Sequence, residues 1–263
     1  MSNNSEEQII LKWKFTPPDF FEAPYVIEEQ DYKIEIDNGS ITATISPALY
    51  ESRPEARMEF HEKINDLFLG AQIINFKRFS ITKPTMHRLH PDGRKDISIF
   101  PEPLVSTATL SASVDIIITD KNGKIVEDTK SKRISSRKNF AELSAKYRRT
   151  DHVAVSILES YNTAVNDPAN EFVHLYEIIE SLCGRFGNEK SLRDALGISK
   201  IYIGKLRRLA NTEPVTQSRH RGKNPGNLRS ADSSEKKDAR EVARKLIQSY
   251  LEYLERKTGA KLN

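Results

Sequence analysis

The sequence predicts an α+β protein with an N-terminal mixed β domain that includes one helix and a C-terminal all-helical bundle. Polar and apolar residues alternate around Asn-Gly turns in the first half, and apolar residues recur at helical spacing in the second half. The chain has 263 residues, of which 37% are hydrophobic, so it can build one or two cores. We therefore expect a β-rich domain over residues 1–135 and a helical domain over residues 136–263.

The first strands of the β domain follow from alternation and from turn signals. Ile10–Phe15 is expected to form a strand that ends before Pro17-Pro18. Tyr32–Asp37 and Ser40–Ser46 are expected to pair as a hairpin around Asn38-Gly39. This dipeptide is a strong hairpin signal, because both turn positions need residues that tolerate a positive φ.

A helix is expected to interrupt these strands over Pro54–Phe68, where Ala56, Phe60, Ile64 and Leu67 fall on one stripe. Turns are expected at Pro91-Asp92-Gly93 and at Asn122-Gly123. The remaining strands expected in this domain are Ala71–Ile81, Asp96–Phe100, Thr107–Thr119 and Lys124–Ile134.

From about residue 135 onward the spacing is helical. Helices are expected over Ser136–Arg148, from Asp151 as a cap, over Asn170–Phe186, over Glu189–Leu196 and over Ser199–Ala210. The last helix is expected to begin at Ser233, which would cap it, and to run to near the end. The helix over Asn170–Phe186 has the longest apolar stripe. These helices can pack as a single bundle.

Charge is distributed unevenly along the chain. The formal net charge is +4, yet the segment Lys130–Arg149 has eight Lys or Arg against Glu142, and Lys205–Arg229 has seven against Glu213. The rest of the chain is therefore acidic. Two basic segments on an acidic body suit an anionic partner, although two solvated faces give the same pattern.

Several classes of protein are disfavoured by the sequence. No apolar run approaches the roughly 18 residues of a membrane span, and the polar segment Met1–Gln8 is unlike a signal peptide. Cys183 is the single cysteine, which argues against an internal disulfide and a cysteine-based zinc site. We expect a cytoplasmic protein with no membrane partner, no metal and no cofactor.

Residues Leu192–Leu206 resemble a DNA-binding helix-turn-helix. Gly197 lies where two short helices must turn sharply, and the apolar residues around it match the positions that this motif buries. The second helix would then present Lys200, Tyr202, Lys205, Arg207 and Arg208. An ordinary helical corner within a bundle has the same pattern and is the alternative.

The long turn-rich segment Asn211–Gly226 contains Arg219, His220, Arg221 and Lys223 with one acid, Glu213. A β-rich front followed by a helical bundle, with an Asn and an Arg-His dipeptide before the last helix, resembles the HEPN-like helical proteins of bacterial toxin and antiviral-defence systems. Many members of that family are metal-independent ribonucleases that use an Arg, a polar residue and a His.

The resemblance implies His220 as general acid or base, Arg219 as phosphate ligand and Asn211 as the polar residue. The family spaces its Arg four to six residues before the His, and this chain has no Arg there. An alternative for the loop is that its arginines pair with carboxylates of the last helix, such as Glu235 or Asp238.

The function that we favour is binding of nucleic acid or another phosphate-rich partner by the helical domain, in a bacterial defence or stress system. The residues expected to contact RNA or DNA are Lys200, Lys205, Arg207, Arg208, Arg221 and Lys223. Ribonuclease activity, a helix-turn-helix DNA binder and a non-catalytic protein-interaction scaffold are the alternatives. A homodimer through the helical domain is a further hypothesis.

Overall fold

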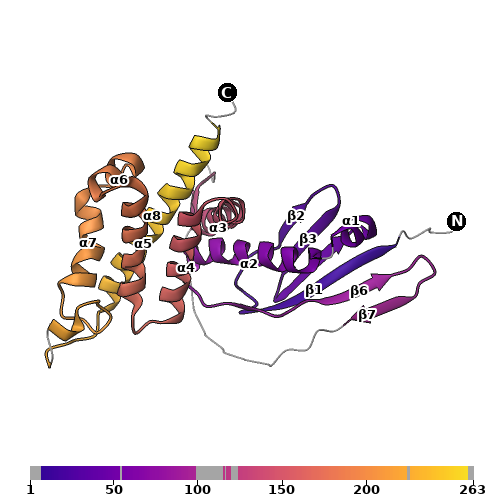
Figure 1. Cartoon of the computed structure of the whole chain (residues 1–263), viewed down its shortest axis with the longest axis horizontal. Helices are drawn as coiled ribbons and strands as arrows, with labels where there is room; N and C mark the ends of the chain where they lie inside the picture. Colours follow the sequence, from indigo (N-terminus) through magenta and orange to yellow (C-terminus); the bar gives the residue numbers. More distant parts are fainter. Residues whose placement is uncertain are drawn as a thin grey trace. The chain divides into compact units, whose positions relative to one another are not determined.

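The computed structural model describes residues 7–53, 55–98, 115, 117–119, 124–223 and 226–259. The chain has an α+β fold with an N-terminal antiparallel sheet and mostly C-terminal helices, which confirms the predicted fold class (Figure 1). It divides into two compact units. The N-terminal unit comprises Met1–Phe68 and Phe79–Asn139, and the helical unit comprises Leu69–Arg78 and Phe140–Asn263.

The N-terminal unit is built on an antiparallel sheet. In the described residues its strands are β1 (Gln8–Thr16), β2 (Tyr25–Glu28), β3 (Tyr32–Asp37), β4 (Ser40–Ile45), β5 (Ser80–Ile81), β6 (Thr85–Leu89) and β7 (Lys95–Ser98). Their order across the sheet is β2-β3-β4-β1-β6-β7, and β5 pairs with the end of β1. The long strand β1 is therefore central, with β4 on one side and β6 on the other.

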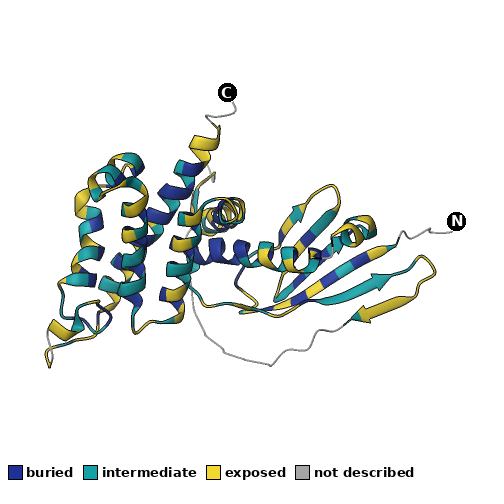
Figure 2. Cartoon of the chain, viewed as in Figure 1, coloured by how far each residue is buried: buried dark blue, intermediate teal, exposed yellow. Residues whose placement is uncertain are grey.

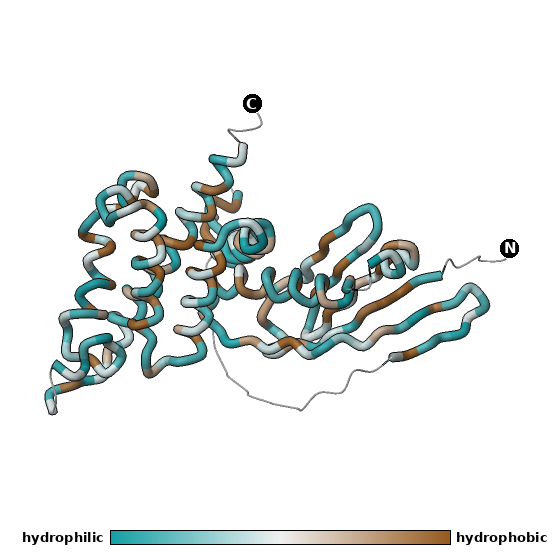
Figure 3. The backbone as a smooth tube through the Cα atoms, in the orientation of Figure 1, coloured by the Kyte–Doolittle hydropathy of each residue, from teal (hydrophilic) through white to brown (hydrophobic). Residues whose placement is uncertain are grey.

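Alternation along β1 creates the core face of this sheet. Ile9, Leu11, Trp13 and Phe15 are buried, and the residues between them are more exposed (Figure 2). The predicted β3–β4 hairpin is present, with Asp37 opposite Ser40 and with positive φ at Asn38 and Gly39. The β6–β7 hairpin, which ends the sheet on the side away from β2, is largely hydrophilic (Figure 3).

Two helices follow β4, namely α1 (Pro47–Ser52) and α2 (Ala56–Asn75). The part of α2 that ends at Phe68 packs on the N-terminal unit, where Phe68 makes ring contacts with Phe15 and Phe20. The predicted strand over Ala71–Ile81 is wrong except for Ser80–Ile81, which form β5, because α2 continues to Asn75 and no strand follows before Ser80. A short apolar run has no periodicity that separates strand from helix, and packing decided the outcome here.

The second half of the N-terminal unit contains the small sheet β8 (Ile117–Thr119) and β9 (Ile125–Asp128), followed by α3 (Thr129–Tyr147). The predicted strand over Lys124–Ile134 is correct only as far as Asp128. Asp128 accepts hydrogen bonds from the backbone and hydroxyl of Ser131, which starts the helix earlier than predicted. Residues 107–114 of another predicted strand lie outside the described residues.

The helical unit contains the end of α2, the last turns of α3, and the helices that follow them. These are α4 (His152–Asn166), α5 (Glu171–Phe186), α6 (Glu189–Leu196), α7 (Lys200–Asn211) and α8 (Ser233–Gly259), with a 3-10 turn at Arg221–Lys223. Helix α5 is central, because it contacts α4, α6, α7 and α8. The boundary predicted near residue 135 falls inside α3, and the second segment of the helical unit begins at Phe140.

Capping residues account for most of the helix starts. Asp151 accepts a hydrogen bond from the backbone of Ala154 at 2.8 Å, as the predicted cap of α4. The prediction that Ser233 caps α8 is wrong, because Asp232 performs that role. Its carboxylate accepts from the backbone of Glu235, whose own carboxylate accepts from the backbone of Asp232, which is a capping box.

Helices α2 and α3 meet at Gly70. A Cβ placed on Gly70 would lie 2.2 Å from the carbonyl oxygen of Phe140 and 2.7 Å from the Cα of Ala141. These are backbone atoms within a helix, so they have little freedom to move away. Only glycine allows the two backbones to approach this closely, although glycine in a helix interior costs about 1 kcal/mol relative to alanine.

Glu22 joins the start of α3 to the segment after β1. Its carboxylate accepts hydrogen bonds from Arg133 at 2.5 and 2.7 Å and from Arg137 at 2.7 Å. Arg137 is only 4% exposed and also donates to the carbonyl of Phe20. The hydrogen bonds from Arg133, with the charge of Arg137, lower the pKa of Glu22 to about 2. Glu22 therefore compensates the charge of a buried guanidinium.

We predict that Gly70→Ala lowers the free energy of unfolding by about 3 kcal/mol, because the added methyl overlaps helix backbone. The melting temperature should fall by about 6–12 °C. Gly204→Ala in α7 is the control, since no atom lies within 4 Å of its Cβ position. It should raise stability by about 0.5–1 kcal/mol. Equal melting temperatures for the two variants would contradict the helix crossing.

We predict that Glu22→Gln destabilises the protein by about 2 kcal/mol at pH 7, because it leaves Arg137 without its carboxylate. The pKa of Glu22 is lowered from 4.5 to about 2, so the stabilisation is complete above about pH 4.5 and is lost as the pH falls towards 2. Chemical denaturation across that range measures it. Glu29→Gln, at an exposed position, is the control, and an equal loss in both variants would refute the prediction.

Candidate functional site

The turn between α6 and α7 has the local geometry expected of a helix-turn-helix. Gly197 adopts the left-handed conformation with φ of 66°, and Ser199 caps α7 by accepting from the backbone of Tyr202. The apolar residues singled out in the sequence are buried: Leu192, Leu196, Ile198, Ile203 and Leu206. A helical corner inside a bundle has the same features, so this geometry alone does not separate the two interpretations.

Most basic side chains of α7 are ion-paired within the helical unit. Lys205 lies 3.3 Å from Asp238, Arg208 lies 3.5 Å from Glu213, and Arg207 pairs with Glu189. Lys200, at the start of α7, is exposed and has no carboxylate within ion-pair distance among the described residues. The neighbouring Ile201 is 83% exposed. The free part of α7 is thus its N-terminal turn.

The loop between α7 and α8 is held by its own backbone. Thr216 donates to the carbonyl of Arg229, and Arg229 donates to that of Pro214, so Val215 and Arg229 form a parallel bridge. The side chain of Gln217, 8% exposed, accepts from the backbone of Ala231 at 3.0 Å. These bonds fix the two ends of the loop side by side.

Arg219 and Arg221 fasten the loop to α5. Arg219 donates to Glu180 at 2.6 Å, and its guanidinium lies 5.0 Å from the centre of the Tyr176 ring. Arg221 donates to the carbonyl of Thr216 at 3.1 Å and to the side chain of Asn170. The carboxylates of α8 that the sequence suggested as partners bind other residues, since Glu235 pairs with Arg229 and Asp238 with Lys205.

The three residues suggested for catalysis are neighbours in the backbone. Asn211 is the last residue of α7, and the backbone of Arg219 donates to the carbonyl of Ala210 at 2.9 Å. Within the described ranges, no hydrogen bond joins the side chains of Asn211, Arg219 and His220 to one another. His220 is half-buried, and no described residue binds its ring. Lys223 is exposed.

Arg229 and Glu235 form a pair with two parallel hydrogen bonds. The guanidinium donates to both carboxylate oxygens of Glu235 at 2.6 Å. These hydrogen bonds lower the pKa of Glu235 to about 2, so this carboxylate stays ionised at neutral pH. Glu213 lies 3.6 Å from the same guanidinium. The guanidinium of Arg229, at the end of the loop, is therefore neutralised by carboxylates and is not free to bind a ligand.

Across the described ranges, no three His, Cys, Asp or Glu side chains are grouped in a way that could hold a metal ion. No helix in those ranges has both the length and the apolar content needed to cross a membrane.

The chain matches no protein-family model, no curated protein and no solved structure.

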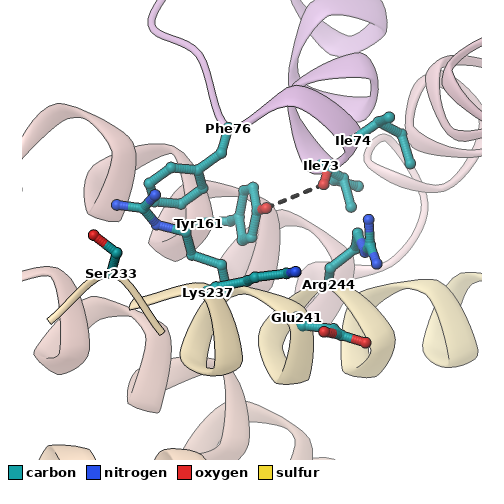
Figure 4. Close-up of a pocket in the computed structure, with 9 residues that line it drawn as sticks. Ile73, Ile74, Phe76, Tyr161, Ser233, Lys237, Glu241 and Arg244 are labelled. Atoms are coloured by element: carbon teal, nitrogen blue, oxygen red, sulfur yellow. Dashed lines mark hydrogen bonds between the residues drawn. The ribbon is translucent and has the colours of Figure 1, made fainter. Parts of the chain in front are cut away.

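The structure adds a pocket that the sequence did not indicate. It lies in the helical unit, has a volume of about 230 Å³, and is bordered by Lys237 and Arg244 of α8 (Figure 4). Their spacing of seven residues on α8 was the available signal, because it places both on one helix face. This spacing is also typical of an ordinary solvated helix face. In addition, the end of α2, which forms the floor of the pocket, was predicted as part of the strand over Ala71–Ile81.

We predict that Arg221→Ala lowers the free energy of unfolding by about 1–2 kcal/mol, because a carbonyl and an amide oxygen both lose their charged donor. The melting temperature should drop by roughly 3–6 °C. Lys223→Ala, which removes an exposed cation from the same loop, should change stability by less than about 0.5 kcal/mol. If the melting temperature of Arg221→Ala equals that of the wild type, the Arg221 side chain does not hold the loop.

Proposed function

We propose that the helical unit binds a phosphate-rich partner, RNA or DNA. The observation that supports this is the separation of charge between the two units. The helical unit has 24 Lys and Arg against 16 Asp and Glu, a formal charge of +8, and the N-terminal unit has 17 against 21, a formal charge of −4. A polyanion is therefore attracted to the helical unit and repelled by the N-terminal unit.

The ion pairs of α7 are compatible with this proposal. Lys205 and Asp238 have side chains that are 46% and 43% exposed, and pairs of this kind contribute only about 0–1 kcal/mol each. A phosphate can therefore displace the carboxylate at little cost. Lys200 and Lys223 need no such exchange, because they have no ion-pair partner among the described residues. Binding of this kind releases counterions and weakens as salt increases.

The unpaired N-terminal turn of α7 supports a specific version of the proposal, in which α7 is a DNA recognition helix. Such helices contact base edges with their N-terminal residues, and these are the residues of α7 that are free. Lys200 could donate hydrogen bonds to the acceptor atoms of guanine, and the exposed Ile201 could pack on a thymine methyl group.

A protein-interaction scaffold is the second candidate function. It is favoured by the number of basic side chains that carboxylates of the same unit neutralise, among them Arg207, Arg208, Arg219 and Arg229. Under this alternative the charge of these residues maintains the fold, and the helical unit has no affinity for nucleic acid of any kind.

The resemblance to HEPN-like bundles supports a role in bacterial defence or stress, and it brings ribonuclease activity as an option. In that option His220 would act as the general acid or base. Arg219 would have to leave Glu180 before it could hold a phosphate. The catalytic option therefore requires a rearrangement that binding alone does not require.

We predict that the protein binds labelled RNA or DNA with an affinity that falls steeply with salt, measured by fluorescence anisotropy. Lys200→Gln/Lys223→Gln should weaken binding about tenfold. Lys12→Gln/Lys14→Gln removes the same charge from exposed positions of β1 and should change affinity less than twofold. Undetectable binding of single- and double-stranded RNA and DNA at low salt would contradict the proposal and favour the scaffold.

The same samples test cleavage. If the wild type cuts RNA, His220→Asn should retain binding and lose cleavage, with a pH optimum in the wild type. RNA that stays intact during prolonged incubation with the wild type would remove the ribonuclease option and leave the binding proposal in place.

A further inference from the structure

The pocket of the helical unit is formed by three elements. Ile73 and Phe76 come from the end of α2 and the residue after it, Tyr161 comes from α4, and Lys237 and Arg244 come from α8 (Figure 4). At about 230 Å³ it is smaller than the roughly 300–1,000 Å³ of pockets that enclose a whole small molecule. It therefore suits one chemical group of a larger ligand.

The floor of the pocket is apolar and rigid. The hydroxyl of Tyr161 donates to the carbonyl of Ile73 at 3.1 Å, and its ring meets the Phe76 ring edge to face at 5.4 Å. Burial raises the pKa of Tyr161, so the hydroxyl stays neutral. Phe76 has a φ of 49°, in the left-handed region that a bulky residue rarely adopts. Packing against neighbours holds it in this conformation.

Arg240 forms one wall and is itself neutralised. Its guanidinium lies 4.1 Å from the centre of the Phe76 ring and donates to both oxygens of Glu171, at 2.7 and 2.8 Å. The Glu171 side chain is 1% exposed, so this pair compensates a buried charge. Arg240 is therefore committed to the fold and has little charge left for a ligand.

Lys237 and Arg244 differ from Arg240, because neither has a carboxylate partner among the described residues. Figure 4 shows both side chains along the α8 edge of the pocket. Glu241 also lines this edge, and its carboxylate points away from the Tyr161 ring. Two cations at one recess repel each other, and the apolar floor beside them lowers the local dielectric constant. An anion placed between them relieves this repulsion more strongly than it would in bulk water.

We propose that this pocket binds one phosphate group of a nucleic-acid strand, with Lys237 and Arg244 as its ligands. The planar guanidinium of Arg244 can donate two parallel hydrogen bonds to phosphate oxygens, and the ammonium of Lys237 supplies a compact charge. The small volume fits a single group of a long polyanion. This inference rests on the proposed nucleic-acid binding and assigns it an anchor that lies outside α7 and its loop.

The test compares two double variants of α8 that remove the same charge. Lys237→Gln/Arg244→Gln alters the pocket, and Lys236→Gln/Lys245→Gln alters positions of the same helix that do not line it. Affinity for a labelled single-stranded RNA and DNA is measured by anisotropy between low and physiological salt. The pocket variant should bind at least tenfold more weakly, and its slope of log K against log salt should be smaller by about two.

The Lys236→Gln/Lys245→Gln control should bind within threefold of the wild type. Both variants should keep the wild-type melting temperature, since none of the four side chains is ion-paired to a described residue. Arg244→Lys retains the charge without the planar fork and should lose affinity by an intermediate factor. These results together would support the phosphate anchor.

Three outcomes would overturn the inference, and they are distinguishable. If the wild type binds nucleic acid and both double variants bind equally well, the pocket is not the anchor although the proposed function survives. If the wild type binds no nucleic acid, the proposed function fails and the anchor fails with it. If the pocket variant retains nucleic-acid binding but loses affinity for a labelled Asp/Glu-rich peptide, the pocket recognises a protein carboxylate.

Discussion

The close approach of α2 and α3 at Gly70 is the constraint on which the helical unit depends. Because no side-chain atom fits there, the two helices meet backbone to backbone, and this fixes the next turn of α2. In that turn Ile73 offers its carbonyl to Tyr161, and Phe76 follows the helix with a positive φ. Phe76 then packs under Arg240, which neutralises a buried carboxylate of α5. The steric requirement at Gly70 thus determines contacts of α2 with α4, α5 and α8, and these contacts form the floor of the pocket.

Basic side chains in the helical unit fall into two groups with different physical consequences. Those of α7 and the following loop mostly have carboxylate partners, as Arg219 has in Glu180 and Arg229 in Glu235. Such pairs orient the loop, but each carboxylate cancels most of the positive electrostatic potential of its cation. Lys237 and Arg244 lack partners in the described part of the chain and lie beside an apolar recess, where a charge acts more strongly. The cations most suited to a ligand are therefore on α8, while the density of basic residues in the sequence is highest elsewhere.

Elements whose determinants are adjacent in the sequence were predicted well. Asn38-Gly39 and Asp151 each act within a few residues, and the hairpin and the start of α4 follow from them directly. Of the strand predicted over Ala71–Ile81 only Ser80–Ile81 formed, because a short apolar run suits either structure, and contacts with distant helices settled it. The sequence located the basic residues of α7 and of the loop that follows it. It did not indicate the partner of each cation, since Arg219 and Glu180 are 39 residues apart.

The sequence by itself determined the α+β class, most of the helices after residue 150, and the excess of positive charge in the second half of the chain. These properties depend on composition and on periodicity within a few turns, so no tertiary information is needed to recognise them. Only the tertiary structure decided that α2 extends to Asn75, that Glu22 joins Arg133 and Arg137, and which cations remain free. Those outcomes depend on which side chains come within a few ångströms of one another, and residues far apart in the chain are brought together only when the fold is complete.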